Sequence, residues 1–319
     1  MNYYNTMDKH AKIFVAGHNG LVGSSIVKKL KSLEYDNLIL KTRQELNLLD
    51  QTAVDNFFKT ENIEYVFLAA AKVGGIMANQ QKKADFIYEN LQIQNNVIYS
   101  AYKYKIKKLL FLGSSCIYPR NCPQPIKEEY LLTGELESTN DAYAIAKIAG
   151  IKMCQSFNAQ YGTNFISVMP TNLYGPNDNF SLTDSHVLPA LIRKIYEAKI
   201  NGDASLALWG SGSAQREFLH VDDLADAAVY LINNYDGSEI VNIGTGADLS
   251  IKELAEKIKG ILEYTGEITW DITKPDGTPR KLLDVSRLQG LGWAATINLD
   301  AGLKETIVWF IKNYESLRK

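Results

Sequence analysis

The chain has 319 residues, of which 46% are hydrophobic and 22% are charged, and its formal net charge is −2. This composition is ordinary for a globular enzyme, and the length allows a large core, in two lobes. No long basic tract occurs, which argues against nucleic acid and anionic membranes as partners. The three cysteines form no C-x-x-C pair, so we expect neither a disulfide framework nor a metal site. Without a signal core or a membrane-spanning apolar run, the expected compartment is the cytoplasm.

A glycine-rich turn follows the first expected strand. Residues 12–16 form a short apolar run typical of a buried strand, and an amphipathic stretch follows the turn up to Lys31. Glycines let a backbone approach a pyrophosphate at a helix N-terminus, where free N–H groups and the helix dipole favour anions. The spacing is G-x-x-G-x-x-G, which differs from the usual G-x-G-x-x-G. The turn predicts a dinucleotide site formed by Gly17, His18, Asn19, Gly20, Leu21, Val22 and Gly23.

The second expected strand, at 37–40, leads into Lys41 and Arg43. A site for NAD usually has an acidic residue near this point to bind the ribose 2′-hydroxyl. Cations suit a 2′-phosphate instead, so we predict that the cofactor is NADP(H); the alternative is that both are solvated loop charges. Asp50 either caps the helix that follows or meets the adenine.

Strands and helices alternate through the first half of the chain. This alternation predicts an α/β fold with a doubly wound parallel sheet, as in Rossmann folds. The expected strands are 65–71, 108–113 and 164–169, and the expected helices are 84–104 and 142–161.

From about residue 176 the pattern loosens into loops and isolated helices, such as 187–199 and 250–262. We therefore predict an NADP-binding domain over 1–175 and a smaller C-terminal α/β domain over 176–319 that binds the substrate. An apolar run at 239–243 could return the chain to the main sheet.

The helix at 142–161 carries Tyr143 and Lys147 on one face, roughly 5–6 Å apart at Cβ. A lysine cation there can lower the pKa of a phenol from about 10 toward neutrality, and such a tyrosine can exchange a proton with a sugar oxygen. Ser114 follows the strand at 108–113, at the sheet edge where ligands bind. Taken alone, a Tyr-Lys pair is common on helices, and Ser114 would be read as a turn residue. The convergence of all three residues at one sheet edge favours a catalytic role.

The glycine turn, the serine and the Tyr-x-x-x-Lys pattern occur in the order of the short-chain dehydrogenase/reductase superfamily, and the chain resembles its extended branch, which modifies nucleotide sugars. A finer resemblance is to the GDP-L-fucose synthase family. Gly-Ser-Ser-Cys-Ile-Tyr-Pro is the most specific of its motifs, because related dehydratases and 4-epimerases lack a cysteine there. The motifs are AAAKVGGI at 69–76, GSSCIYP at 113–119, YAIAKIAG at 143–150, MPTNLYGP at 169–176, REFLHVDD at 216–223 and KPDGTPRK at 274–281.

The resemblance implies NADPH-dependent 3,5-epimerisation and 4-reduction of GDP-4-keto-6-deoxy-D-mannose to GDP-L-fucose. In the family, Tyr143 would be the general acid, Lys147 would lower its pKa and bind the nicotinamide ribose, and Ser114 would bond the reacting oxygen. A 4-keto group acidifies the hydrogens on C3 and C5, so Cys116 could act as base if its pKa falls below about 8.5, with His186 as the acid. Without the resemblance, the preferred interpretation of Cys116 would be a small buried hydrophobic residue. His186 would be a loop histidine that caps the helix at 187–199.

The resemblance also implies further ligand contacts. Cations should flank the substrate diphosphate, and the implied substrate-binding residues are Lys194, Trp209, Arg216, Asp276 and Lys281. Added cofactor contacts are Leu112, Gly113, Ser114, Ser115, Lys147, Pro170, Thr171, Asn172, Leu173 and His186.

The chain departs from the family at two positions, because arginine is frequent where Asn19 and Lys194 stand here. A preference for NADP then depends on Lys41 and Arg43, and tolerance of NAD stays open. Alternative functions are a nucleotide-sugar 4-epimerase or 4,6-dehydratase, and a non-catalytic NADP-sensing protein of the same fold. Family members are often dimers through a helix pair, so we expect a homodimer joined by the helices at 84–104 and 142–161.

Overall fold

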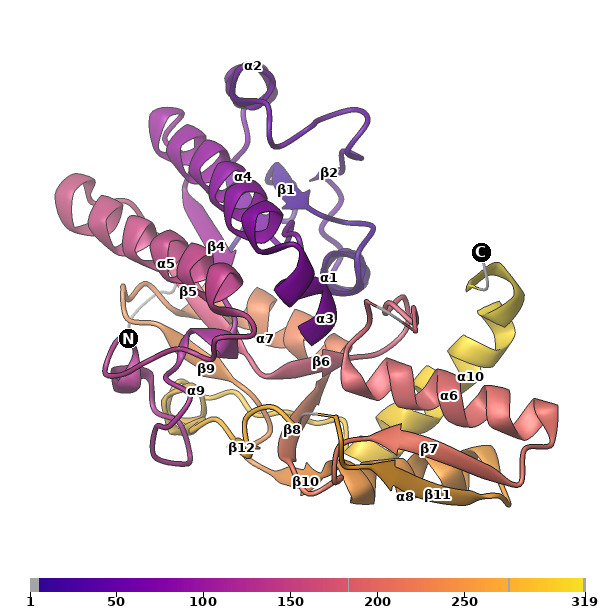
Figure 1. Ribbon diagram of the computed structural model, residues 1–319. Coiled ribbons are helices and arrows are strands. Elements are labelled where there is room, and N and C mark those ends of the chain that lie inside the picture. Colours follow the sequence, from indigo (N-terminus) through magenta and orange to yellow (C-terminus); the bar gives the residue numbers. More distant parts are fainter. Residues whose placement is uncertain (1–5, 183, 275, 318–319) are drawn as a thin grey trace.

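The centre of the fold is a six-stranded parallel sheet. The computed structural model describes residues 6–182, 184–274 and 276–317 (Figure 1). The strands lie in the order β2-β1-β3-β4-β5-β9, and each neighbouring pair is parallel, which confirms the predicted doubly wound α/β fold. The strands are Ile13–Ala16 (β1), Leu38–Ile39 (β2), Tyr65–Leu68 (β3), Lys108–Leu112 (β4), Phe165–Pro170 (β5) and Val241–Ile243 (β9).

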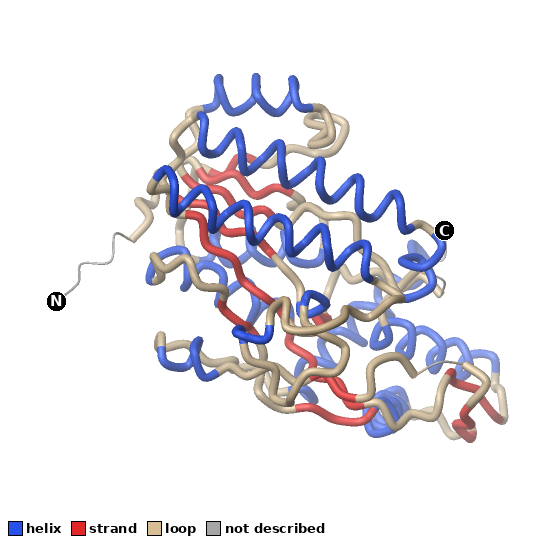
Figure 2. The backbone as a smooth tube through the Cα atoms, turned by 60° about the vertical axis from the view of Figure 1, so that its left-hand side comes forward, coloured by secondary structure: helices blue, strands red, loops and turns tan. Residues whose placement is uncertain are grey.

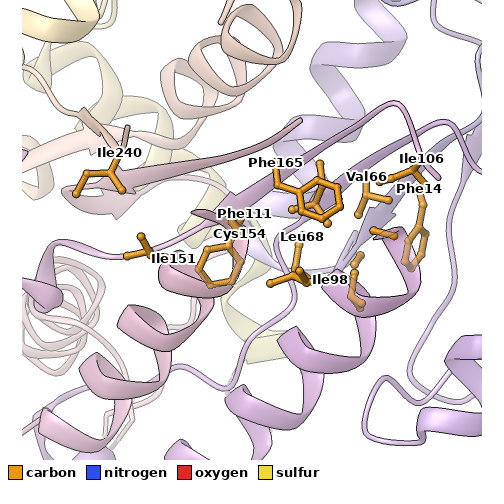
Figure 3. Close-up of a cluster of buried hydrophobic side chains, with 14 of the residues drawn as sticks. Phe14, Val66, Leu68, Ile98, Ile106, Phe111, Ile151, Cys154, Phe165 and Ile240 are labelled. Carbon is orange, nitrogen blue, oxygen red and sulfur yellow. The ribbon is translucent and has the colours of Figure 1, made fainter. Parts of the chain in front are cut away.

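Helices cover both faces of this sheet. Successive strand residues point to opposite faces, so Phe14 joins the hydrophobic core under α2, α4 and α5, whereas Ile13 and Val15 join the core under α1 and α7. Figure 2 shows three helices running side by side along one face, and Figure 3 shows Phe111 and Phe165 in the core beneath them. The helices are Leu21–Ser32 (α1), Gln51–Glu61 (α2), Lys83–Lys103 (α4), Asp141–Tyr161 (α5) and Val221–Asn234 (α7).

The chain returns to this sheet well after residue 176. Strand β9 pairs with β5, with Val168 opposite Val241, which confirms the return predicted near 239–243. Helix α7 packs against α1, and α9 (Ser286–Gly290) packs against β9. The main sheet and its helices therefore draw on both halves of the chain.

A second part of the molecule surrounds its own hydrophobic core, under α6, α8 and α10 (Figure 1). Helices α6 and α8 confirm the helices predicted at 187–199 and 250–262, and strands occur in this α/β part where the sequence pattern had indicated loops. The structure adds a parallel pair, β7 with β11, and a short mixed sheet around β8. Several of these strands are short or exposed, and they pair with distant segments, so their alternation carries little signal.

The remaining elements complete this second part and the loops around the main sheet. Within the described residues, no helix has the length and apolar character needed to cross a bilayer. The elements are β6 (Asn172–Tyr174), α6 (Val187–Asn201), β7 (Ser205–Trp209), β8 (Gln215–His220), β10 (Asp248–Ser250), α8 (Ile251–Leu262), β11 (Glu267–Asp271), β12 (Arg280–Lys281), α10 (Leu299–Leu317), α3 (Ile76–Gln81), and the 3-10 helices η1 (Ser115–Ile117) and η2 (Glu128–Tyr130).

Candidate active site

The site begins where the strand order of the main sheet reverses. Because β2 and β3 lie on opposite sides of β1, the carboxyl ends of β1 and β3 border the crevice where open α/β sheets bind ligands. Gly17 follows β1 with a φ of +86°, and a Cβ there would lie 2.8 Å from the Ala70 nitrogen. A Cβ at Gly23 would lie 2.1 Å from the Gly17 carbonyl oxygen. These two positions admit only glycine, so backbone segments come into close contact on both sides of the turn.

This turn leads directly into the N-terminus of α1. Gly20 is the N-cap residue, and no side chain caps the helix, so the first-turn N–H groups and the helix dipole are available to a pyrophosphate. The Nδ1 atom of His18 is buried without a hydrogen-bond partner among the described residues. An uncapped helix start beside an orphaned buried nitrogen fits a dinucleotide cofactor.

Lys41 and Arg43 lie just past the end of β2. The Arg43 side chain is 74% exposed, and its guanidinium lies 3.9 Å from the Glu89 carboxylate, so it is only loosely paired. Lys41 is half-buried. Asp50 caps α2, because its carboxylate accepts a backbone N–H of the first turn at 3.0 Å. This is the first of the two roles predicted for Asp50.

Two further segments leave the sheet at the same edge. Gly113 and Ser114 follow the end of β4, and Thr171 connects the end of β5 to β6. The side chains of Thr171 and Asn172 both donate hydrogen bonds to the Glu217 carbonyl oxygen, at 3.3 and 2.8 Å. These bonds tie the carboxyl edge of the main sheet to β8 in the second part.

Tyr143 and Lys147 face this edge from α5. Gly150 allows the helix to approach β4, since a Cβ there would lie 2.4 Å from the Phe111 ring. Lys147 is only 4% exposed, and its Nζ donates to the Leu112 carbonyl oxygen at 2.7 Å. The same Nζ lies 5.8 Å from the centroid of the Tyr143 ring. The predicted pair is therefore adjacent in space, but the lysine bonds the backbone.

The expected lowering of the Tyr143 pKa by Lys147 is not found. Burial, and secondarily the Cys116 thiol, raise the pKa of Tyr143, while its hydrogen bond with Ser114 offsets part of the rise. Burial also lowers the pKa of Lys147 to about 7, so its charge is weakened at neutral pH. Tyr143 is consequently a protonated phenol in this arrangement, which suits a group that must donate a proton.

Cys116 lies beside Tyr143 in η1. The Ser114 hydroxyl caps this short helix and accepts the Cys116 N–H at 3.2 Å. Two donors reach the Cys116 sulfur: the Asn140 side-chain Nδ2 at 3.2 Å and the Lys281 Nζ at 3.6 Å. The thiol is thus held between an amide and a cation.

Asn140 is a site residue that the sequence analysis missed. It stands at the N-cap position of α5, where asparagine ordinarily caps a helix, but its side chain makes no cap hydrogen bond. Its Oδ1 is buried without a partner among the described residues. An asparagine three residues before Tyr143, at a helix start, was the available signal.

His186 comes from the segment before α6, in the second part. The Gly75 N–H donates to the Asp184 carbonyl oxygen at 2.9 Å, and a Cβ at Gly75 would lie 2.5 Å from the Ser185 carbonyl oxygen. His186 is open to solvent on one side, yet the protein around its imidazole lowers its pKa, and the Lys281 cation lowers it further. Cys116 and His186 therefore share Lys281 as a charged neighbour.

The loop before α3 connects this segment with Tyr143. Asn79 holds the loop by donating to the carbonyl oxygens of Gly74 and Gly75, at 2.8 and 3.0 Å. A Cβ at Gly74 would lie 3.2 Å from the Phe86 ring, and that ring packs edge-on against Tyr143 with centroids 6.3 Å apart. One loop thus supports both the phenol and the segment that carries the imidazole.

Lys194 and Trp209 form a pair on the second part of the molecule. The Lys194 Nζ lies 4.7 Å from the centroid of the Trp209 ring, and the Lys274 Nζ lies 5.7 Å from it. Trp209 is 53% exposed, so its ring is available to a planar ligand.

Arg216 and Lys281 lie opposite each other on the parallel strands β8 and β12. Burial lowers the pKa of Arg216, and the guanidinium donates to the Asp276 carbonyl oxygen at 3.3 Å. The Asp276 carboxylate accepts the backbone N–H and the hydroxyl of Ser211, at 2.7 and 2.8 Å. Asp276 therefore joins two loops, next to a pair of cations that could receive a diphosphate.

Known proteins are similar to this chain in sequence and in architecture. Residues 13–244 match the NAD dependent epimerase/dehydratase family. GDP-L-fucose synthase 1 of Arabidopsis thaliana is 60% identical over 306 residues, covering 96% of this chain and 95% of that protein. Two solved structures are similar: a GDP-6-OMe-4-keto-L-xylo-heptose reductase from C. jejuni (TM-score 0.93, 42% identity, 97% of this chain and 100% of that one) and a GDP-L-fucose synthetase from Naegleria fowleri bound to NADP (TM-score 0.92, 30% identity, 100% and 98%).

The family model matches most of the chain, and the Arabidopsis relative is 60% identical along nearly its whole length. Both findings agree with the glycine turn and with the Ser114-Tyr143-Lys147 set. The chain therefore belongs to the NAD dependent epimerase/dehydratase family and, within it, to the GDP-L-fucose synthases.

Proposed function

We propose that this protein converts GDP-4-keto-6-deoxy-D-mannose to GDP-L-fucose, by inverting C3 and C5 and then reducing C4 with NADPH. The name and high identity of its relatives support this proposal. The observation that carries it is the Cys116 thiol, which contacts Asn140 and Lys281 next to Tyr143. A simple reductase needs only the phenol, whereas ring epimerisation needs a second proton-transfer group.

NADP(H) would be held along the carboxyl edge of the main sheet. When bound, NADPH supplies the hydride that reduces C4. The uncapped start of α1 binds the pyrophosphate, and Lys41 with Arg43 binds the 2′-phosphate. The proposed contacts are Gly17, His18, Asn19, Gly20, Leu21, Val22, Gly23, Lys41, Arg43, Asp50, Leu112, Gly113, Ser114, Ser115, Lys147, Pro170, Thr171, Asn172, Leu173 and His186.

Epimerisation needs a base on one face of the sugar ring and an acid on the other. The 4-keto group acidifies the C–H bonds at C3 and C5. The Cys116 thiolate takes the proton while the C–H electron pair forms an enolate whose charge rests on O4. His186 then gives a proton to the opposite face of the carbon, and the keto group reforms. Exchange with solvent returns Cys116 to the thiolate and His186 to the imidazolium.

Reduction uses the phenol of Tyr143. Because burial raises its pKa, Tyr143 is protonated at neutral pH and can give its proton to O4 as C4 is reduced. The Ser114 hydroxyl bonds the same oxygen and orients it. Lys147 then stabilises the tyrosinate that remains.

The residues of 176–319 would bind the rest of the substrate. Arg216 and Lys194 supply positive charge for the diphosphate, Trp209 offers an exposed ring beside Lys194, and Asp276 and Lys281 border Arg216. This assignment gives the second part of the molecule the role of a substrate-binding domain.

We also propose that the enzyme works as a cytoplasmic homodimer, joined through α4 and α5. Large hydrophobic side chains are exposed on these two helices: Tyr88 (64%), Tyr99 (47%), Ile145 (47%) and Tyr161 (49%). Such a patch favours burial against a second copy. Molar mass measured by light scattering tests the assembly, and a protomer mass at micromolar concentration would contradict it.

The decisive experiment is a direct assay of the purified protein with GDP-4-keto-6-deoxymannose and NADPH. We expect one NADPH to be oxidised per GDP-L-fucose formed, with solvent deuterium entering C3 and C5. NADPH that binds but is never consumed would favour the NADP-sensing alternative. A tightly held cofactor regenerated in each turnover would favour a 4-epimerase or 4,6-dehydratase.

A further inference from the structure

The two residues of β12 carry cations that point in opposite directions. The Arg280 Nε pairs with the Asp248 carboxylate of β10 at 2.6 Å, whereas the Lys281 Nζ lies 3.6 Å from the Cys116 sulfur. Successive residues of a strand face opposite sides. The pairing of β12 with β8, where Lys281 lies opposite Arg216, therefore directs Lys281 into the site.

Lys281 has no carboxylate partner within the described part of the chain, although its side chain is half-buried. A small cavity lies next to Lys281. The carboxylate that lines this cavity, Glu137, forms an ion pair with Arg120 at 3.3 Å. The phenol of Tyr118, on the same cavity, donates to Asn242 at 2.6 Å. The positive charge of Lys281 is thus left to act on the other groups around it.

Those groups are two thiols, an imidazole and a second cation. Lys281 contacts Cys116, and its charge lowers the pKa of His186. It also lowers the pKa of Cys122, against a larger rise caused by burial. Arg216 lies across the strand pair. Lys281 therefore contacts one proposed proton-transfer group, Cys116, and acts through its charge on the other, His186.

We propose that Lys281 is a positioning residue that couples Cys116 to His186 during epimerisation: its cation holds Cys116 as the thiolate and, once the sulfur is protonated, favours proton release from His186. This inference rests on the proposed function. Before the transfer, the thiolate charge balances the lysine. When the C–H proton moves to the sulfur, that balance is lost, and the uncompensated cation opposes the imidazolium at the moment when a proton must be returned.

A diphosphate-binding role alone makes a different prediction. A lysine that only binds the substrate would change KM and leave the chemistry of the free thiol untouched. A lysine that holds the thiolate changes the reactivity of Cys116 in the absence of any substrate, because the thiolate is the nucleophile.

The first test therefore measures alkylation of Cys116 by iodoacetamide as a function of pH. A Cys122→Ser background leaves Cys116 and the buried Cys154, and peptide mapping identifies the modified residue. With Lys281→Met or Lys281→Gln, we expect Cys116 to react about tenfold more slowly at neutral pH, with the profile midpoint about one pH unit higher.

Two variants control this measurement. Lys281→Arg keeps the charge and should restore most of the reactivity. Arg280→Gln removes the neighbouring cation, which pairs with Asp248, and should leave the profile unchanged. Unfolding midpoints show that each variant is folded. A profile that is the same with and without the lysine would overturn the proposal.

The second test follows deuterium entry into the substrate at saturating concentration. Lys281→Met should slow exchange at C3 and C5 about tenfold, with NADPH affinity unchanged. Exchange at the wild-type rate with only a higher KM would overturn the coupling role. The alkylation test needs no sugar nucleotide, so failure of the proposed function appears in the turnover assay alone.

Discussion

The glycine turn after β1 and the cluster around Cys116 are built in opposite ways. In the turn, Gly17 and Gly23 bring backbone segments into contact, and Gly20 leaves α1 uncapped. The cluster instead brings an amide and a cation to a sulfur, and Lys281 lies 165 residues from Cys116 in the chain. The first site is therefore sensitive to added volume, whereas the second is sensitive to the loss of a charge or a proton.

The largest expected effect breaks the second site. Cys116→Ser replaces the proposed base, so epimerisation should slow by about 10²–10⁴-fold, the usual contribution of a general acid or base. NADPH affinity should not change, because the glycine turn is untouched. Cys122→Ser is the matched control and should keep wild-type activity. Deuterium exchange into C3 and C5 at the wild-type rate in Cys116→Ser would rule out the base assignment.

Added volume breaks the first site. Gly23→Ala places a Cβ where the Gly17 carbonyl oxygen stands, so the turn must open and NADPH binding should weaken by at least about tenfold, or roughly 1.4 kcal/mol. Gly260→Ala in α8 is the control, since a Cβ there meets nothing within 4 Å. This control should keep its affinity and gain about 1 kcal/mol of stability from helix propensity. Equal affinities, measured by fluorescence titration, would show that the turn does not hold the cofactor.

A pH experiment sharpens the comparison at Lys147, a buried cation beside Tyr143. Its folded pKa is about 7, and its unfolded value is about 10.4. Between these values only the unfolded chain binds the proton, so this group makes the free energy of unfolding rise with pH, by up to about 1.4 kcal/mol per unit. Below pH 7 the buried Lys147 is fully charged, and it destabilises the folded state to its full extent. Lys147→Met should lack this rise in urea unfolding between neutral pH and about pH 9. If the free energy of unfolding rose equally with pH in the wild-type protein and in Lys147→Met, burial of the Lys147 charge would not be the cause.

The smallest expected effect separates the two roles of Asp50. Asp50→Ala removes the cap of α2 and should lower the free energy of unfolding by about 1 kcal/mol. An unchanged stability would show that the cap contributes nothing. NADPH affinity, measured on the same variant, tests the contact with the adenine.

Most of the main sheet could be predicted because its signals are local. The apolar run of β1, the glycine turn and the helix that carries Tyr143 are each defined by a short continuous stretch of sequence. Strand β9 was visible as a short apolar run. The finer resemblance brought Cys116, His186 and Lys281 into one list, but no pattern places Lys281 against the sulfur, since its direction depends on the register of a two-residue strand. The pKa of Tyr143 was also beyond prediction, because it depends on how deeply α5 packs.

The contact between Gly75 and the 184–186 segment separates two properties that an enzyme engineer would want to change independently. Backbone atoms alone set the spacing there, since any side chain at position 75 would strike the Ser185 carbonyl oxygen. Under the proposed function, the placement of His186 against the sugar ring depends on that backbone contact, whereas the rest of the substrate meets side chains of α6 and β7, such as Lys194 and Trp209. If the proposed assignment holds, we expect libraries built on those helix and strand positions to change which nucleotide sugar is accepted and to keep the same configuration in the product.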